Sequence, residues 1–434
     1  RAQFRVMSSI IQKLFLWMSM TWMGCYGNFT SFNDSLVPIT PVPSRCVEYL
    51  NLAASNLNME PLGVDLLNVN KQSGKAFVYS DLTILHQLLQ LFIIGSPVAK
   101  ALIKNFLGLR LDAECENYFC ESFNILIERI KSSSMNVKYG SVFYQDPQEA
   151  ERRSLIKCTA TKVINFPRKL NAVVRKVNID YRNIIEMPSA KCLERDIKLK
   201  TDFFMMQGFK LSTTTSGQTK VTGLRIPFTD IDGKETKIDW IRMTGQFWVV
   251  ATILRTQEDR EHYNCVLWRF RTEINDGRQY GLYFMVRFQG ITDLDRKLEC
   301  IQKVLVNLKR YAKETINKDL SARHIRRDPD FSNLLVPVMN FSTDATVDSL
   351  GSKMLGLFDE NQISNLFNYK ATLRELRSCE YFHNEQENTL ELPVAKLTGE
   401  KNRNSTLHLS SPFVFTVVDR ETGILLKTGV YLRP

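Results

Sequence analysis

The chain has 434 residues, 44% of them hydrophobic, and carries a formal net charge of +11. This length and apolar content allow a large buried core and exclude an intrinsically disordered protein. Acids are interspersed among the Lys and Arg residues, so the sequence has no basic arm of the kind that binds nucleic acid, and a solvated basic surface explains the charge most simply. A glycosaminoglycan or another polyanion is the alternative partner, and its first candidate ligands are Arg152, Arg153, Lys157, Lys162, Arg168 and Lys169.

Residues 1–24 have the composition of a secretory signal peptide. A weakly basic stretch that ends at Lys13 precedes an apolar core over residues 14–23, and small residues suitable for cleavage follow. The core is too short to span a bilayer, so we predict no transmembrane segment. We expect translation to start at Met7, an exposed leader over residues 25–49 and a single domain over residues 50–434. An apolar N-terminal helix of a cytosolic protein is the alternative.

Sequons and cysteines agree with export. Cys115 and Cys120 are close enough in the sequence to bridge each other or to remain free thiols, and we expect one or two disulfides with connectivity left open. Nine cysteines are dispersed without metal-ligand spacing, at positions 25, 46, 115, 120, 158, 192, 265, 300 and 379. Four glycosylation sequons occur, at Asn28, Asn33, Asn340 and Asn404.

The first half of the chain favours helices and the second half strands. Apolar residues recur at helical spacing over residues 82–92 and 173–185. Residues 197–205 and 282–288 alternate instead, which is typical of strands with two distinct faces. Apolar runs on both sides of a turn at residues 419–423 predict a C-terminal hairpin. Helices followed by many strands indicate the α+β class.

No enzyme motif is present. The sequence lacks a nucleophile elbow, a phosphate loop, a dinucleotide fingerprint and an HExxH helix. His86 lies in the first predicted helix and we interpret it as structural, while His324 lies in a basic stretch that favours a solvated loop. We therefore predict no enzymatic activity, no metal and no cofactor.

Several segments resemble the serpin family. Residues 407–417 and 429–434 are similar to its C-terminal signature and closing strands, with Ser410 where the family has Asp, Asn or Gln. Ser80-Asp81-Leu82-Thr83-Ile84 resembles its Ser-Pro-x-Ser-Ile motif, with Asp81 in place of Pro. Further similar pieces are Val177-Asn178 and residues 202–208, 336–341 and 355–358, in the family's order.

The resemblance implies a serpin fold, in which helices pack around a large central mixed sheet, with smaller sheets and an exposed reactive-type loop. It also implies that Ser80, Thr83 and Asn178 are shutter-like residues beneath that sheet. Inhibitory serpins trap a protease by inserting the cleaved loop into the sheet as a new strand, and their hinge reads Glu-Gly-Thr followed by small residues.

The matching hinge here departs from the inhibitory pattern. Glu387 and Thr389 fit it, Asn388 replaces the Gly, and Glu391 and Pro393 would face inward after insertion. A buried carboxylate and a proline in a central strand both oppose insertion. The usual cleavage bond falls near Asn402, Arg403 and Asn404, where a glycan on Asn404 would obstruct a protease. Arg403 is either a specificity residue or an ordinary exposed arginine.

We therefore predict a secreted, extracellular, non-inhibitory serpin that acts as a binding, carrier or structural component for a protein partner that the sequence does not name. The alternative is an inhibitor of a trypsin-like serine protease with Arg403 near the scissile bond. Small-ligand carriage is also open, because the fold can form pockets between helices and sheet.

Overall fold

The structure is a computed structural model, and its folded unit covers Pro43–Pro434. The residues it describes are 41–57, 59–71, 74, 76–94, 97–109, 113–133, 137–145, 160–163, 175–176, 179, 183, 203–212, 219–222, 226–254, 264–274, 277–317, 331–346, 377–383, 389–391 and 406–434.

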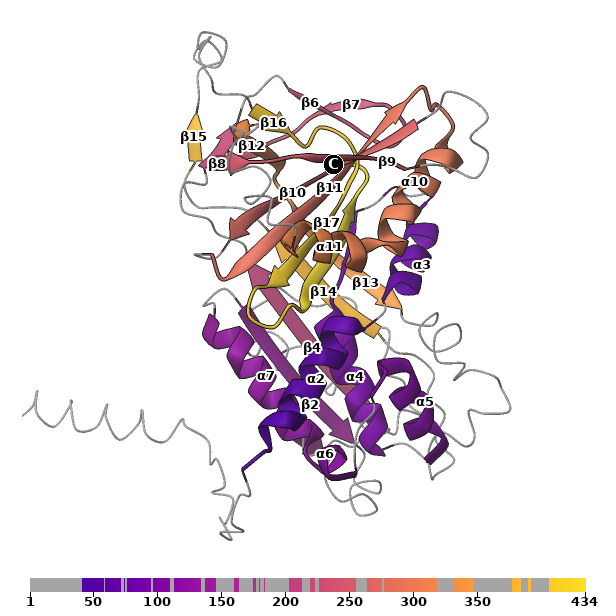
Figure 1. The fold of residues 1–434 in the computed structure, drawn as a ribbon, viewed down its shortest axis with the longest axis vertical. Helices are drawn as coiled ribbons and strands as arrows, with labels where there is room; N and C mark the ends of the chain where they lie inside the picture. Colours follow the sequence, from indigo (N-terminus) through magenta and orange to yellow (C-terminus); the bar gives the residue numbers. More distant parts are fainter. Residues whose placement is uncertain are drawn as a thin grey trace, which may run out of the picture. The chain divides into compact units, whose positions relative to one another are not determined.

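A six-stranded antiparallel sheet forms one part of the core (Figure 1). The C-terminal hairpin lies inside it, and its turn is fixed by Gly423, whose φ is +71°, and by Asp419, whose carboxylate accepts hydrogen bonds from Thr422. In spatial order the strands are β1 (Phe77–Tyr79), β18 (Leu425–Tyr431), β17 (Phe413–Asp419), β11 (Gln279–Gln289), β10 (Asn264–Ile274) and β9 (Val250–Leu254).

A second sheet mixes parallel and antiparallel pairs. Strands β14 and β4 run parallel at its centre, and so do β2 and β3 at one side, whereas β13–β14 and β2–β4 are antiparallel. In spatial order the strands are β13 (Asn340–Thr346), β14 (Arg377–His383), β4 (Phe203–Ser212), β2 (Val137–Gln145) and β3 (Ala160–Val163).

The third sheet contains five short to medium strands, and a small two-stranded ribbon accompanies it. Its order is β15 (Thr389–Glu391), β5 (Thr219–Thr222), β8 (Trp240–Phe247), β12 (Phe331–Pro337) and β16 (Thr406–His408), and the ribbon pairs β6 (Pro227–Thr229) with β7 (Glu235–Lys237).

Helices surround these sheets. Helix α4 contacts both β4 and β18 and is therefore buried between the mixed sheet and the C-terminal hairpin. Helix α10 begins after Asp293, whose carboxylate caps it by accepting from the backbone N–H of Arg296. The described helices are α2 (Ser44–Asn56), α3 (Glu60–Asn70), α4 (Asp81–Ile94), α5 (Pro97–Leu107), α6 (Ala113–Asn117), α7 (Phe119–Ser133), α10 (Leu294–Val306) and α11 (Leu308–Asn317).

The predicted α+β class, the helix over residues 82–92 and the C-terminal hairpin are confirmed. Residues 282–288 were expected to form a strand with one buried and one exposed face. This is wrong for residues 282–286, which are all buried. The reason is that α10 packs against β11 and the side chains on both faces of β11 belong to the buried hydrophobic core. The described part of α4 is likewise buried almost all round rather than on one stripe, because it lies between two sheets.

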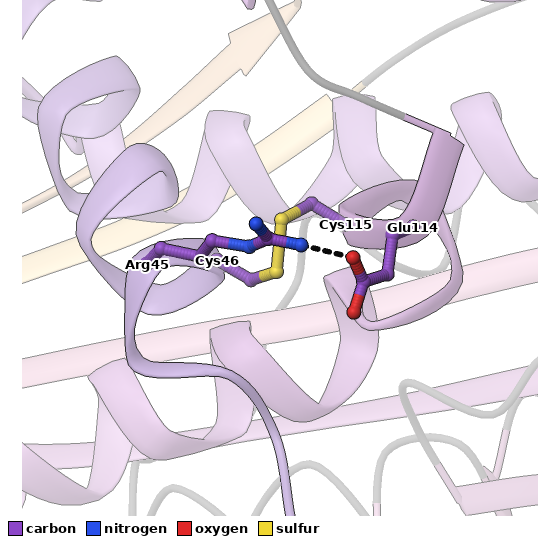
Figure 2. Close-up of a disulfide and its surroundings, with 4 residues drawn as sticks. All are labelled: Arg45, Cys46, Glu114 and Cys115. Atoms are coloured by element: carbon purple, nitrogen blue, oxygen red, sulfur yellow. Dashed lines mark hydrogen bonds and ion pairs between the residues drawn. A yellow bond between two sulfur atoms is a disulfide. The ribbon is translucent and has the colours of Figure 1, made fainter.

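Helix α2 starts before Leu50, the predicted start of the domain, and a disulfide ties its first turn to α6. Figure 2 shows this Cys46–Cys115 bond beside the ion pair between Arg45 and Glu114. The folded unit therefore includes residues that the sequence assigned to a leader, because Cys46, Val47 and the residues after them bury an apolar face.

The suggested bridge between Cys115 and Cys120 is wrong. Cys115 pairs with Cys46, since α2 and the α6–α7 segment are neighbours in space, and Cys120 is disulfide-bonded to a residue outside the described part. A second described disulfide, Cys265–Cys300, joins β10 to α10.

Candidate functional site

The centre of the mixed sheet is a seam between β4 and β14. Five residues of each strand pair in parallel, from Cys379 opposite Gly208 to His383 opposite Ser212. Within the described residues no strand lies between them, so the sheet is closed at this position. A strand can be added here only if these backbone hydrogen bonds first break.

The segment that follows β14 supplies β15, which pairs with the edge of the third sheet. Thr389, Leu390 and Glu391 lie opposite residues 220–222 of β5 in a parallel arrangement. The described part of the hinge, Thr389–Glu391, therefore has strand conformation, but on a different sheet from the seam. The other predicted loop residues, Glu387, Asn388, Pro393, Asn402, Arg403 and Asn404, lie outside the described residues.

Two of the three shutter-like residues lie at the start of α4, and both are fully buried. The backbone N–H of Thr83 donates to the Ser80 hydroxyl over 3.3 Å, which satisfies one of the free donors at the helix N-terminus. Ser80 and Thr83 are thus linked at the buried N-terminus of α4, and their shutter-like role stays a prediction. Asn178 lies outside the described residues.

A buried polar group on α4 faces the mixed sheet one turn further along. His86 contacts the Tyr139 hydroxyl of β2 through Nδ1 and lies 3.2 Å from the Gln90 amide through Nε2, and its ring stacks on Phe123 at 4.3 Å. Burial lowers the pKa of His86 to about 3, so the imidazole is neutral at physiological pH. The interpretation of His86 as a structural residue is confirmed. Its partners on β2 and α7 were not foreseen, because they are distant in the sequence.

Asp81, the first residue of α4, is a buried carboxylate. Neither of its oxygens has a hydrogen-bond partner among the described residues, and the ammonium of Lys309 on α11 forms an ion pair with it at 3.9 Å. Burial raises the pKa of Asp81 to about 7, and the positive charge of Lys309 opposes that effect. Lys309 also donates to the Ser55 carbonyl over 3.1 Å. The only signal in the sequence was an acid where the resembling motif has proline.

Among the remaining predicted site residues, the structure describes Asn340 and Lys162. Asn340 is the first residue of β13, opposite His383, and Lys162 belongs to β3. The other three sequons, the other five clustered cations and the predicted signal peptide lie outside the described residues. In the described part of the chain, no cluster of His, Cys, Asp or Glu is arranged to hold a metal ion, and no helix is long and apolar enough to cross a membrane.

Comparison with solved structures identifies the architecture. A tumour-suppressing serpin matches with 12% identity and a TM-score of 0.62, over 89% of this chain and 100% of that chain. Native protease nexin-1 with heparin matches with 13% identity and a TM-score of 0.60 over the same shares. The chain has the serpin fold.

Uncleaved ovalbumin gives a third match to this serpin-fold chain, with 12% identity and a TM-score of 0.60, over 88% of this chain and 99% of that chain. No family model and no curated protein matches the sequence. The fold expected from the residues at the C-terminus and around Ser80 is therefore confirmed by structure, at an identity that establishes architecture alone. A new strand between β4 and β14, at the centre of this mixed sheet, would have to enter at the seam between them.

Proposed function

We propose that this chain is a secreted serpin-fold protein that does not trap proteases and acts by binding a protein partner. The observation that carries the proposal is the sequence of the hinge, which places Glu391 and Pro393 in the segment that trapping would require to insert.

Insertion has a local cost at these two residues. If Thr389 faces the core of an inserted strand, the two-residue period of strands makes Glu391 and Pro393 face it as well. Burying a carboxylate without a partner costs several kcal/mol after relaxation. Proline has no N–H and therefore removes a ladder hydrogen bond from a central strand.

The closed seam adds to that cost. The five-residue parallel pairing between β4 and β14 and the three-residue pairing between β15 and β5 must both be lost before the loop can enter. Insertion creates two new strand pairings in return. In a favourable loop that exchange is a net gain, and Glu391 and Pro393 oppose it.

Secretion is supported by the disulfides together with the predicted signal peptide and sequons. Cys46–Cys115 and Cys265–Cys300 are long-range bonds of the kind that form and persist in oxidising compartments.

Thermal unfolding before and after proteolytic nicking of the loop near Arg403 tests the proposal. We expect no change in the midpoint for the natural sequence. The matched variant Glu391→Ala with Pro393→Ala should regain insertion, with a rise of roughly 10 °C or more, since each kcal/mol moves the midpoint of a large domain by roughly 2–4 °C. A similar rise in the natural sequence would overturn the proposal.

The alternative is inhibition of a trypsin-like protease, and the observation that favours it is Arg403 at the expected cleavage position. It predicts a covalent complex with the protease that survives SDS. Incubation with several trypsin-like enzymes distinguishes the two functions, because a non-inhibitory loop is cut without forming a complex.

Binding of a polyanion is a separate part of the proposal. It rests on the net charge of +11 and on the cations clustered between residues 152 and 169. Retention on a heparin column, compared with a variant in which Arg152, Arg153 and Lys157 are replaced by Ser, tests it. Equal elution of the two proteins at low salt would exclude that cluster.

A further inference from the structure

A row of three side chains crosses one face of the six-stranded sheet near its β9 edge. Ile253 of β9 lies opposite Val266 of β10, and Val266 lies opposite Arg287 of β11. Residues directly opposite in antiparallel strands share a face, so these side chains are neighbours on one surface. Ile253 is 58% exposed, Val266 is half-buried and Arg287 is exposed.

An indole ring supports the arginine. Trp268 follows Val266 by two residues and therefore lies on the same face, and the Arg287 guanidinium carbon is 3.8 Å from the centroid of a Trp268 ring. Stacking on an aromatic ring fixes the plane of a guanidinium and partly desolvates it, while the edge of the fork stays open for hydrogen bonds. Partial burial accordingly lowers the pKa of Arg287.

Arg287 differs from the other arginines that lie over aromatic rings near this sheet, because each of those has a hydrogen-bond or ion-pair partner. Arg271 and Arg420 lie over Tyr280 and donate to the backbone carbonyls of Ile316 and Gly277. Arg269 and Arg310 both lie over Tyr311, and each of them pairs with the carboxylate of Glu314. No acid among the described residues forms an ion pair with Arg287. Its positive charge instead adds to burial in lowering the pKa of the neighbouring His408.

We propose that Ile253, Val266, Trp268 and Arg287 form a docking surface for a partner protein, which contributes a carboxylate to the guanidinium and an aliphatic side chain to Ile253. The planar fork of arginine matches a carboxylate in two parallel hydrogen bonds, and a fork held by stacking loses little freedom on binding. Ile253 is exposed two strands away. Burying it against an apolar side chain of the partner, next to the carboxylate, would stabilise the complex.

The composition of the surface favours a peptide over a sulfated glycan. Polyanions bind arrays of cations, whereas the four residues of this surface comprise one guanidinium, an indole ring and two aliphatic side chains. None of the four residues belongs to β15 or to the chain that follows it before β16, so the docking surface does not depend on whether the loop inserts.

Selection from a random dodecapeptide phage library tests the proposal, with the purified natural protein as bait and Arg287→Ala for counter-selection. We expect the peptides retained by the natural protein alone to carry Asp or Glu beside Leu, Ile or Val. A synthetic peptide of that sequence should change the tryptophan fluorescence on binding. Arg287→Ala should weaken its binding roughly tenfold to a hundredfold, which is typical of losing hydrogen bonds to a charged group.

Two variants sharpen the test. Ile253→Ser should also weaken binding, by roughly threefold to tenfold for the loss of one partly buried aliphatic contact. Arg310→Ala is the matched control, because that arginine also lies over a tyrosine but pairs with Glu314, and it should bind like the natural protein. Both arginines are exposed, so unchanged circular dichroism and thermal midpoints should accompany either substitution.

Three results would overturn the proposal. These are selected peptides without an acid, peptides that bind Arg287→Ala as well as the natural protein, and an equal loss of affinity in Arg310→Ala. If heparin displaces the peptide from the natural protein and itself binds more weakly to Arg287→Ala, the surface would be assigned to polyanions instead.

Discussion

Replacing Asp81 by asparagine should stabilise the protein at high pH and leave its stability at low pH nearly unchanged. In the folded state the carboxyl is buried and has no hydrogen-bond partner in the described part of the chain. Asparagine has almost the same shape and no charge. At low pH, where Asp81 is protonated, the two proteins therefore bury equivalent neutral groups.

The size of the effect follows from the pKa of Asp81. Burial raises it from the ordinary value of 3.8 to about 7, which corresponds to about 4 kcal/mol at about 1.36 kcal/mol per pKa unit. Because the folded pKa lies above the unfolded one, the folded chain holds the proton more tightly. The contribution of the Asp81 proton to the free energy of unfolding is therefore complete below about pH 4. It decreases as the pH rises and is lost above about pH 7.

The pKa of about 7 already includes the attraction of Lys309, which opposes the effect of burial. The ammonium of Lys309 lies 3.9 Å from the Asp81 carboxylate. Lys309 keeps its hydrogen bond to the Ser55 carbonyl, so it is not left without a partner. We therefore expect Asp81→Asn to gain roughly 2–4 kcal/mol near pH 8 and only roughly 1 kcal/mol near pH 4.5.

Urea unfolding of both proteins at several pH values between about 4.5 and 8.5 measures the difference directly, and subtraction removes the titrations that they share. The other charged groups around the site, Glu60 and Lys313, are present in both proteins. The exposed pair Asp295–Lys71 provides the control, and Asp295→Asn should change stability by less than about 0.5 kcal/mol. A stability difference for Asp81→Asn that does not vary with pH, or a loss near pH 8, would refute the reasoning.

Three further predictions concern the core. Replacing Cys46 and Cys115 by alanine should cost roughly 2–5 kcal/mol of unfolding free energy, and an unchanged urea midpoint would contradict a structural role for this bond. Gly429→Ala should destabilise by roughly 1–3 kcal/mol, because its Cβ would lie 2.4 Å from the Phe415 ring; a variant with the natural thermal midpoint would show that the ring moves freely. The ring of His86, with a pKa lowered to about 3, should stay neutral in NMR titrations down to about pH 4, so a native-state transition near its ordinary value would disprove the buried assignment.

Some features of this protein follow from local sequence patterns. Apolar residues at helical spacing predicted α4, and the apolar runs around the turn at 419–423 predicted the β17–β18 hairpin, because both structures are made from contacts between residues close in the sequence. The order of the segments around Ser80 and after Leu407 was sufficient to predict the serpin fold, which the structure confirms. The same resemblance assigns Thr389 and Glu391 to the hinge, and that assignment stays a prediction.

Other features were decided by contacts between distant segments. The sequence shows an acid at position 81, but its pKa depends on Lys309 and on the helices that exclude water from it. Nine dispersed cysteines allow many pairings, and only the packing of α2 near α6 selects Cys46 for Cys115.

The row of side chains from Ile253 to Arg287 also depends on contacts between distant segments. A strand pattern predicts which side chains alternate along β9, β10 and β11, but it does not give the register between these strands. A shift of one residue in that register would move Arg287 to the other face, away from Trp268. The sequence by itself therefore determined the elements and the family likeness, whereas the tertiary structure decided which charges are buried, paired or left open, because those properties depend on neighbours that the chain brings together only when it folds.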